Sequence, residues 1–306
     1  MALTPSTARL DTGEATAFLA LCAGAVAMGI SPVFVRFAAA DVGPFASAFW
    51  RVALALPVLY AWMRIEEAGE PAPRPGRLDR ATILAGLAFT GDLFFWHLAI
   101  LNTTVANATF FATTAPIFVI LIVWLVLRQP VSGGTVVGLV LCLLGGASLI
   151  GQSLQVAPER IRGDLYGVAT AVFFGVYFLA VGRARNGRAA GRVTFELSLV
   201  TAAVLLAVAL LFDTRLMPQS WTGLAALVAL AWISHAAGQG LLSVALGRLP
   251  AVFSSLVIFL EAIAGAAFGW IILGEVVTPI QFLGGALILL GIWAARPRPE
   301  RRMTGA

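Results

Sequence analysis

Residues 105–151 read VANATFFATTAPIFVILIVWLVL, then RQPV, then SGGTVVGLVLCLLGGASLIG. The first and third of these segments, 105–127 and 132–151, are apolar, and each is long enough to cross a bilayer. A helix rises about 1.5 Å per residue, so about 20 residues cross a hydrocarbon core of about 30 Å. The short connection contains Arg128 and Pro130, which stop a helix and favour water. The stretch therefore predicts a membrane hairpin of two helices.

The same pattern continues along the whole chain. Of its 306 residues, 60% are hydrophobic and 11% are charged, whereas a soluble domain has about 25% charged residues. The apolar stretches are 16–37, 45–63, 81–100, 105–127, 132–151, 164–182, 193–212, 221–244, 251–273 and 276–295. The longest connection, 64–80, leaves no room for a soluble catalytic, receptor or nucleotide-binding domain. We therefore predict an all-α polytopic membrane bundle of ten transmembrane helices.

Composition excludes several kinds of chemistry. All 20 basic residues are Arg, so the Lys of a P-loop or of a Schiff-base enzyme is absent. His97 and His235 are the two histidines, and Cys22 and Cys142 lie inside apolar stretches. These residues form no metal-binding motif, and no cofactor is expected. Arg lies mainly at span ends rather than on one soluble face, so nucleic acid is not expected as a partner.

The Arg residues also predict the orientation. With the N-terminus in the cytoplasm, fifteen Arg fall on inner segments and three on outer segments. This bias follows the positive-inside rule. We expect both termini to be cytoplasmic, in a plasma membrane of the bacterial inner-membrane type. The sequence leaves the oligomeric state open, and a monomer is one of the states that it allows.

The two halves of the chain resemble each other. An offset of 146 residues superposes the first five spans on the last five, so that Gly29 meets Gly175 and Gly138 meets Gly284. Because five is odd, the second half must cross the membrane in the opposite direction. Inverted repeats around a midplane site are typical of alternating-access carriers. The predicted units are a first repeat at 1–151, an outer linker at 152–163, and a second repeat with a short basic tail at 164–306.

Several motifs resemble those of EamA-type carriers of the drug/metabolite transporter superfamily. In the first half they are Ser31-Pro32-Val33-Phe34 with Arg36, Gly43-Pro44 and Phe49-Trp50-Arg51. In the second half they are Leu246-Gly247, Pro250-Ala251, Glu261 and Leu273-Gly274-Glu275. Two places depart from the family pattern: Leu127-Arg128-Gln129 stands where Leu-Gly-Glu is usual, and Ala262 where Pro is usual. The resemblance implies export of small metabolites through a central cavity, and it is nearest to the YddG-like aromatic amino-acid exporters.

Ionisable residues inside spans are costly and therefore suggest function. Asp92, His235 and Glu261 lie near the middle of their spans, while Arg51 lies nearer an end. Asp92 and Glu261 could each bind a substrate ammonium, carry a coupling proton or pair two helices. Arg51 is read first as part of a structural ion pair or as a helix-end donor, with a functional role as the alternative, and His235 is read as a ligand or an interhelical hydrogen bonder.

The neighbours of these residues suggest the substrate. On an α-helix, Asp92 shares a face with Trp96, and His235 shares one with Gln239. A carboxylate beside an aromatic wall suits an aromatic amino acid or a lipophilic amine. We expect spans 1, 3, 4, 6, 8 and 9 to line the cavity while spans 5 and 10 brace it. The expected substrate-binding residues are Met28, Asp92, Trp96, Phe111, Tyr177, His235, Gln239 and Glu261.

The sequence thus predicts a secondary transporter, not an enzyme, that exports small organic metabolites. Amino acids with aromatic or apolar side chains are the expected substrates, with Asp92 and Glu261 as candidate proton carriers. A lipophilic-cation exporter of the same fold is the alternative. A lipid-modifying membrane enzyme would need a catalytic cluster that the sequence does not show. A channel would differ from a carrier in lacking saturable flux and counterflow.

Overall fold

The computed structural model describes residues 12–38, 41–69, 78–103, 105–150, 158–274 and 277–297. Glu275 and the part of the predicted linker at 152–157 lie outside these residues. Within the described chain, nine helical segments are long and apolar enough to cross a membrane, and Pro279–Ala294 is a shorter apolar helix. Together they occupy the positions of the ten predicted spans, which confirms an all-α membrane bundle.

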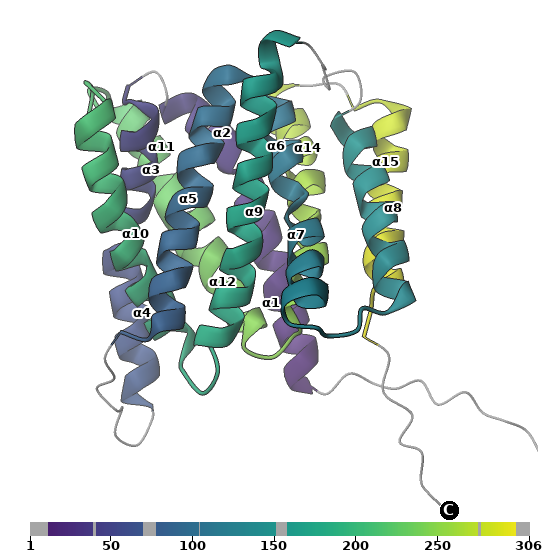
Figure 1. The fold of residues 1–306 in the computed structure, drawn as a ribbon. Helices are drawn as coiled ribbons and strands as arrows, with labels where there is room; N and C mark the ends of the chain where they lie inside the picture. The colour runs from purple at the N-terminus through teal and green to yellow at the C-terminus, as the bar shows by residue number, and fades with distance from the viewer. Residues whose placement is uncertain are drawn as a thin grey trace, which may run out of the picture.

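Several spans consist of more than one helix (Figure 1). The helices are α1 (Thr12–Gly29), α2 (Ser31–Ala38), α3 (Pro44–Ala53), α4 (Leu56–Ala68), α5 (Arg80–Asn102), α6 (Val105–Thr113), α7 (Ala115–Leu121), η1 (Ile122–Val126), α8 (Gly133–Ile150), η3 (Pro158–Arg160), α9 (Ile161–Ala184), α10 (Ala190–Phe212), α11 (Trp221–Ala229), η4 (Leu230–Gln239), α12 (Gly240–Leu246), α13 (Ala251–Val257), α14 (Leu260–Leu273) and α15 (Pro279–Ala294). Both η1 and η4 are π-helical, and η3 is a short 3₁₀ turn.

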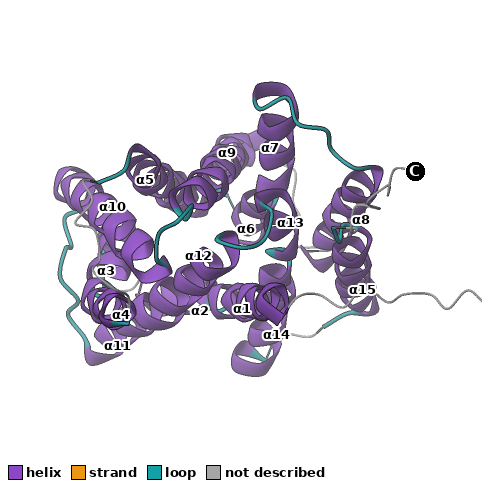
Figure 2. Cartoon of the chain, turned by 90° about the horizontal axis from the view of Figure 1, so that it is seen from below, coloured by secondary structure: helices purple, strands orange, loops and turns teal. Residues whose placement is uncertain are grey.

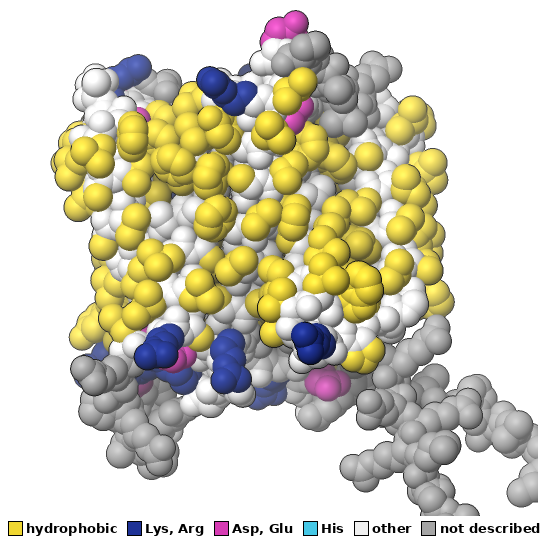
Figure 3. Space-filling model, viewed as in Figure 1, with side chains coloured by type: hydrophobic (Ala, Val, Ile, Leu, Met, Phe, Trp, Pro, Cys, Tyr) yellow, Lys and Arg dark blue, Asp and Glu magenta, His cyan; other side chains and the backbone are white. Residues whose placement is uncertain are grey.

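The bundle presents two polar faces separated by an apolar belt. Helix α1 begins and α15 ends at the lower face of Figure 1, which we call the terminal face. Hydrophobic side chains cover the flank between the two faces, and Arg side chains gather mainly along the terminal face (Figure 3). Helix α9 starts at the opposite face, so the sixth span runs antiparallel to the first (Figure 1). This arrangement is that of an inverted repeat.

The fourth and ninth spans break at matching places. In the fourth span α6 ends at Thr113 and α7 begins at Ala115. Pro116 lacks the N–H that would continue the hydrogen-bond ladder, which explains this break. In the ninth span α13 ends at Val257 and α14 begins at Leu260 without a proline. Both breaks lie beside residues that line the central cavity described below.

Helices α8 and α15, the fifth and tenth spans, pair closely at one side of the bundle (Figure 2). Their contact is built from glycines, which let two backbones approach. A Cβ added at Gly138 would lie 2.5 Å from the Gly291 carbonyl oxygen, and one at Gly284 would lie 2.6 Å from the Gly145 carbonyl oxygen. Neither helix contributes a residue to the lining of the central cavity described below.

The second and seventh spans are joined at both faces. The first residues of α3 and α10 follow Gly43 and Ala189, which offer no capping side chain of their own. At the opposite face Asp213 Oδ2 accepts from the Ala46 N–H at 2.6 Å. At the terminal face Glu66 Oε2 accepts from the Gly191 N–H at 2.6 Å. Each span thus ends in a carboxylate that satisfies the positive N-terminus of the other.

Candidate functional site

A cavity of about 50 Å³ lies in the centre of the bundle. Its volume has room for a few water molecules. The lining residues come from spans 1, 2, 3, 4, 6, 8 and 9, and they are Met28, Ser31, Pro32, Arg51, Asp92, Leu93, Trp96, Thr109, Ala112, Thr113, Phe174, Gln239, Ile258 and Glu261. Helices α8 and α15 contribute none of these residues. The cavity is therefore where the two halves of the chain meet.

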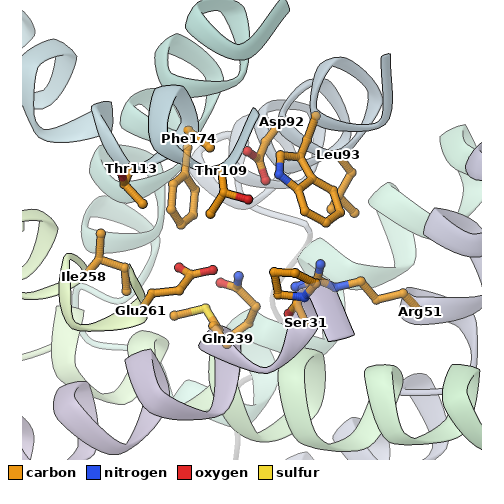
Figure 4. A pocket seen from close by; sticks show the side chains of 14 residues that line it. Ser31, Arg51, Asp92, Leu93, Thr109, Thr113, Phe174, Gln239, Ile258 and Glu261 are labelled. Carbon is orange, nitrogen blue, oxygen red and sulfur yellow. The ribbon is translucent and has the colours of Figure 1, made fainter. Parts of the chain in front are cut away.

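Arg51 brings a cation into this cavity. It sits in α3, is 6% exposed, and its side chain reaches inward from one edge of the site (Figure 4). Within the described chain it forms no ion pair with either cavity carboxylate, and its Nε has no hydrogen-bond partner. Among the described residues, Arg51 thus neither takes part in a structural ion pair nor donates a hydrogen bond to a helix end. Its guanidinium remains available to a ligand.

Asp92 and Glu261 bring two carboxylates from different halves of the chain. Asp92 projects from α5 and Glu261 from the first turn of α14, and Figure 4 shows them on different sides of the cavity. Arg51 attracts each of these carboxylates electrostatically, and the two carboxylates repel each other. Because low-dielectric surroundings strengthen such interactions, the site favours a ligand that offers both a positive and a negative group.

Further polar atoms around the cavity have no protein partner. Ser31 Oγ and Thr109 Oγ1 are buried and make no hydrogen bond among the described residues. Buried hydroxyls usually find a partner, which can be water. Both residues line the cavity, so they are available to water or to a polar ligand. Apolar surface from Trp96, Phe174 and Ile258 completes the wall.

Helix η4 carries two predicted site residues, His235 and Gln239, which make different contacts. His235 is fully buried and its Nε2 shares a hydrogen bond with Ser198 Oγ at 2.9 Å. Gln239 instead lines the cavity. His235 thus makes an interhelical hydrogen bond to α10.

The predicted site residues therefore divide into two groups. Met28, Asp92, Trp96, Gln239 and Glu261 line the cavity together. Three others lie outside its lining. His235 faces Ser198. Tyr177 is buried behind Gln239, and its hydroxyl donates to Gln239 Oε1 at 2.9 Å. Phe111 lies in α6 beside Phe110, against Gly167 of α9.

Sequence reasoning missed Arg51, Ser31 and Thr109 as cavity residues. The rarity of Arg inside a span was the available signal, but counting from the span end placed Arg51 near water. The helical segment begins at Pro44 and runs to Ala68, and the long Arg side chain carries its charge inward from there. Ser and Thr give no signal of this kind, because they occur on many helix faces. No group of three or more His, Cys, Asp or Glu in the described residues could hold a metal ion.

Comparison with protein families gives two adjacent matches. The model of the EamA-like transporter family matches residues 15–150 and again residues 161–295. The two matches cover most of the chain, one in each half. Each copy contributes to the cavity, with Arg51 and Asp92 in the first and Gln239 and Glu261 in the second.

Curated relatives and solved structures agree with this family match. An uncharacterized transporter of Archaeoglobus fulgidus is 27% identical over 282 residues, covering 90% of this chain and 94% of its own length. A second uncharacterized transporter of that organism is 25% identical over 147 residues, covering 47% of this chain and 50% of its own length. A solved crystal structure at 20% identity superposes with a TM-score of 0.77 over 92% of this chain and 96% of that chain. At this identity, the likeness to the crystal structure shows the fold alone.

Proposed function

The chain belongs to the EamA-like transporter family, and from this premise we propose that it exports amino acids with aromatic or apolar side chains. The observation that supports this proposal is the composition of the cavity. One guanidinium and two carboxylates from separate helices line it together with aromatic and aliphatic side chains. In this proposal Arg51 binds the substrate carboxylate while Asp92 or Glu261 binds the ammonium. Trp96 and Phe174 contact the side chain of the substrate.

Transport proceeds by alternating access. Inverted repeats that meet at a midplane site are typical of this mechanism. The cavity of about 50 Å³ is much smaller than a pocket for a small organic ligand, which takes about 300 Å³ or more. The helices around the cavity must therefore separate at one face to admit the substrate.

Asp92 and Glu261 are proposed as the proton carriers of the cycle. Each lines the cavity and has no ion-pair partner within the described chain. A carboxylate that binds a substrate ammonium can take up a proton when that substrate leaves. Substrate and proton would then occupy the same group in turn, which is the basis of antiport.

A lipophilic-cation exporter is the second candidate. The cavity has two carboxylates against one Arg, and Trp96 offers an aromatic face for a cation. A cationic drug without a carboxylate would leave the Arg51 guanidinium buried and unpaired, which is unfavourable. This cost favours the zwitterion over the cation.

Location in the bacterial-type inner membrane, with cytoplasmic termini, also belongs to the proposal. Arg residues gather along the terminal face (Figure 3), and cytoplasmic segments are enriched in Arg and Lys. With the terminal face in the cytoplasm, the direction of export runs from that face to the opposite one.

Counterflow in proteoliposomes tests this function. Vesicles containing the protein are loaded with millimolar unlabelled phenylalanine, and uptake of trace labelled phenylalanine, threonine, a lipophilic amine and a sugar is followed. A transient overshoot for phenylalanine, absent for the sugar, is the expected result. An overshoot for the amine in vesicles loaded with unlabelled amine, without one for phenylalanine in vesicles loaded with phenylalanine, would replace the amino-acid proposal by the cation exporter. No overshoot for any amino acid, with folded protein, would contradict the proposed substrate class.

A further inference from the structure

Tyr177 lies directly behind the cavity wall. It projects from α9, is fully buried, and does not itself line the cavity. Its ring packs against Phe89, at a centroid distance of 5.0 Å, and against Phe174, which stacks on it at 5.8 Å. A fully buried tyrosine packed in this way has little freedom to turn its hydroxyl elsewhere. The position of its Oη is thus set by packing.

The Tyr177 hydroxyl determines which way the Gln239 amide faces. Tyr177 Oη donates to Gln239 Oε1 at 2.9 Å, and this bond is buried. If the amide were reversed, its NH₂ group would meet the phenol oxygen and the buried phenol proton would lose its acceptor. Leaving a buried donor without a partner is costly. The favoured arrangement therefore directs Gln239 Oε1 to Tyr177 and leaves Nε2 free.

The free Nε2 group is available inside the cavity. Gln239 is 2% exposed and lines the cavity together with Arg51 and Glu261. Figure 4 shows its amide directed into the space between them. An N–H donor in this place can bind the same negative group as the Arg51 guanidinium. Two donors from different helices then define one subsite for an anion.

We propose that Tyr177 is a positioning residue that orients Gln239, so that the Gln239 NH₂ group and the Arg51 guanidinium together bind the carboxylate of the substrate. This inference rests on the proposed function and deepens it, because it assigns the subsite that binds the substrate carboxylate. Tyr177 acts through Gln239 and does not touch the substrate. Removing its hydroxyl frees the Gln239 amide to rotate and to present its oxygen to the carboxylate.

The test compares Tyr177→Phe with a matched variant. Tyr166→Phe makes the same chemical change on the same helix, α9, at a residue that does not line the cavity. In phenylalanine counterflow, Tyr177→Phe is expected to raise KM about three- to tenfold, as expected for the loss of one hydrogen bond, with Vmax within twofold of wild type. Tyr166→Phe should change neither value. An unchanged KM for Tyr177→Phe, or a fall in Vmax alone, would overturn the proposal.

A double-mutant cycle separates orientation from a merely structural effect. In a Gln239→Ala background, Tyr177→Phe should add no further rise in KM, because residues that act through one another are not additive. Equal effects of Tyr177→Phe in both backgrounds would refute the positioning role. Where flux is too low to measure, the phenylalanine-dependent rise in melting temperature supplies the affinity of each variant. Wild-type protein that fails to counterflow phenylalanine would instead contradict the proposed function itself.

Discussion

At the scale of single residues, Arg51 changes the chemical character of the site. Without it the cavity contains two carboxylates and would select cations. With it, the cavity can balance a ligand that has both signs of charge. Because its guanidinium is buried without a partner at Nε, an empty cavity leaves part of the desolvation cost of this charge uncompensated. Substrate binding offsets that cost.

Replacing Arg51 by Met tests the role of this charge. The variant keeps most of the side-chain length but loses the charged hydrogen bonds, which are worth about 1.5–3 kcal/mol. We expect KM for phenylalanine to rise by roughly 10- to 150-fold, by the relation of about 1.4 kcal/mol per tenfold. Arg36→Met, an exposed Arg of the neighbouring α2, is the control. Similar KM values for both variants would exclude Arg51 from carboxylate binding.

The sequence identified those site residues that are unusual inside a membrane. Asp92 and Glu261 stood out because carboxylates are expensive there, and Trp96 followed from α-helical spacing to Asp92. Gln239 also lines the cavity, whereas His235, four residues before it, bonds Ser198 instead. Tyr177 could not be assigned its position from the sequence. Whether a tyrosine faces a cavity or the back of its wall depends on packing between distant helices.

At the scale of helices, the apolar pattern predicted the spans closely. The prediction of 81–100 corresponds to α5 at Arg80–Asn102, and that of 193–212 to α10 at Ala190–Phe212. Length and hydropathy decide these elements, because a bilayer imposes one length on all of them. Local departures from regular α-helix within a span were less predictable from the sequence. The break after Val257 and the π-helical η4 contain no proline at the deviation itself, so they arise from tertiary packing.

The close contact of α8 and α15 gives a prediction from two adjacent glycines. A Cβ at Gly284 would lie 2.6 Å from the Gly145 carbonyl oxygen and 2.9 Å from the Leu149 nitrogen, whereas one at Gly285 would meet nothing within 4 Å. Gly284→Ala is therefore expected to reduce the free energy of unfolding by about 1–3 kcal/mol, the usual cost of overpacking. Gly285→Ala should leave stability unchanged or slightly higher, because Ala favours helix.

Thermal unfolding of the two variants in the same detergent measures this difference. A melting temperature for Gly284→Ala equal to that of Gly285→Ala would show that the two helices can move apart without cost. It would then contradict the close glycine contact between the fifth and tenth spans.

At the scale of the whole molecule, the inverted repeat places related contacts at opposite faces. The offset of 146 residues relates position 67 in the last turn of α4 to Asp213 after α10. Glu66, next to position 67, and Asp213 each accept from the first turn of the helix in the other half. Further ion pairs strengthen the terminal face, where Arg192 contacts Glu67 and Arg188 contacts Glu196. The sequence predicted the symmetry, but these contacts depend on loop geometry.

Proton coupling is a property of the complete transport cycle and is tested on that cycle. Replacing Asp92 by Asn together with Glu261 by Gln removes both candidate proton carriers. The phenylalanine flux that this double variant retains is expected to lose its response to an imposed pH gradient. Glu14→Gln, at an exposed carboxylate in the first turn of α1, should keep the response. A double variant whose flux follows the gradient as the wild type does would exclude both residues as proton carriers.

In the proposed transport cycle, the small volume of the cavity makes water a participant. A space that holds a few water molecules must widen to admit an amino acid, and on the return step solvent fills the widened space before it closes. Each turnover of the proposed cycle would therefore move water in and out of the protein along with the substrate. Solutes too large to follow that water draw it away from the open form, so osmotic stress favours the occluded one. The proposed transporter is in this sense sensitive to the concentration of solutes that are excluded from its cavity.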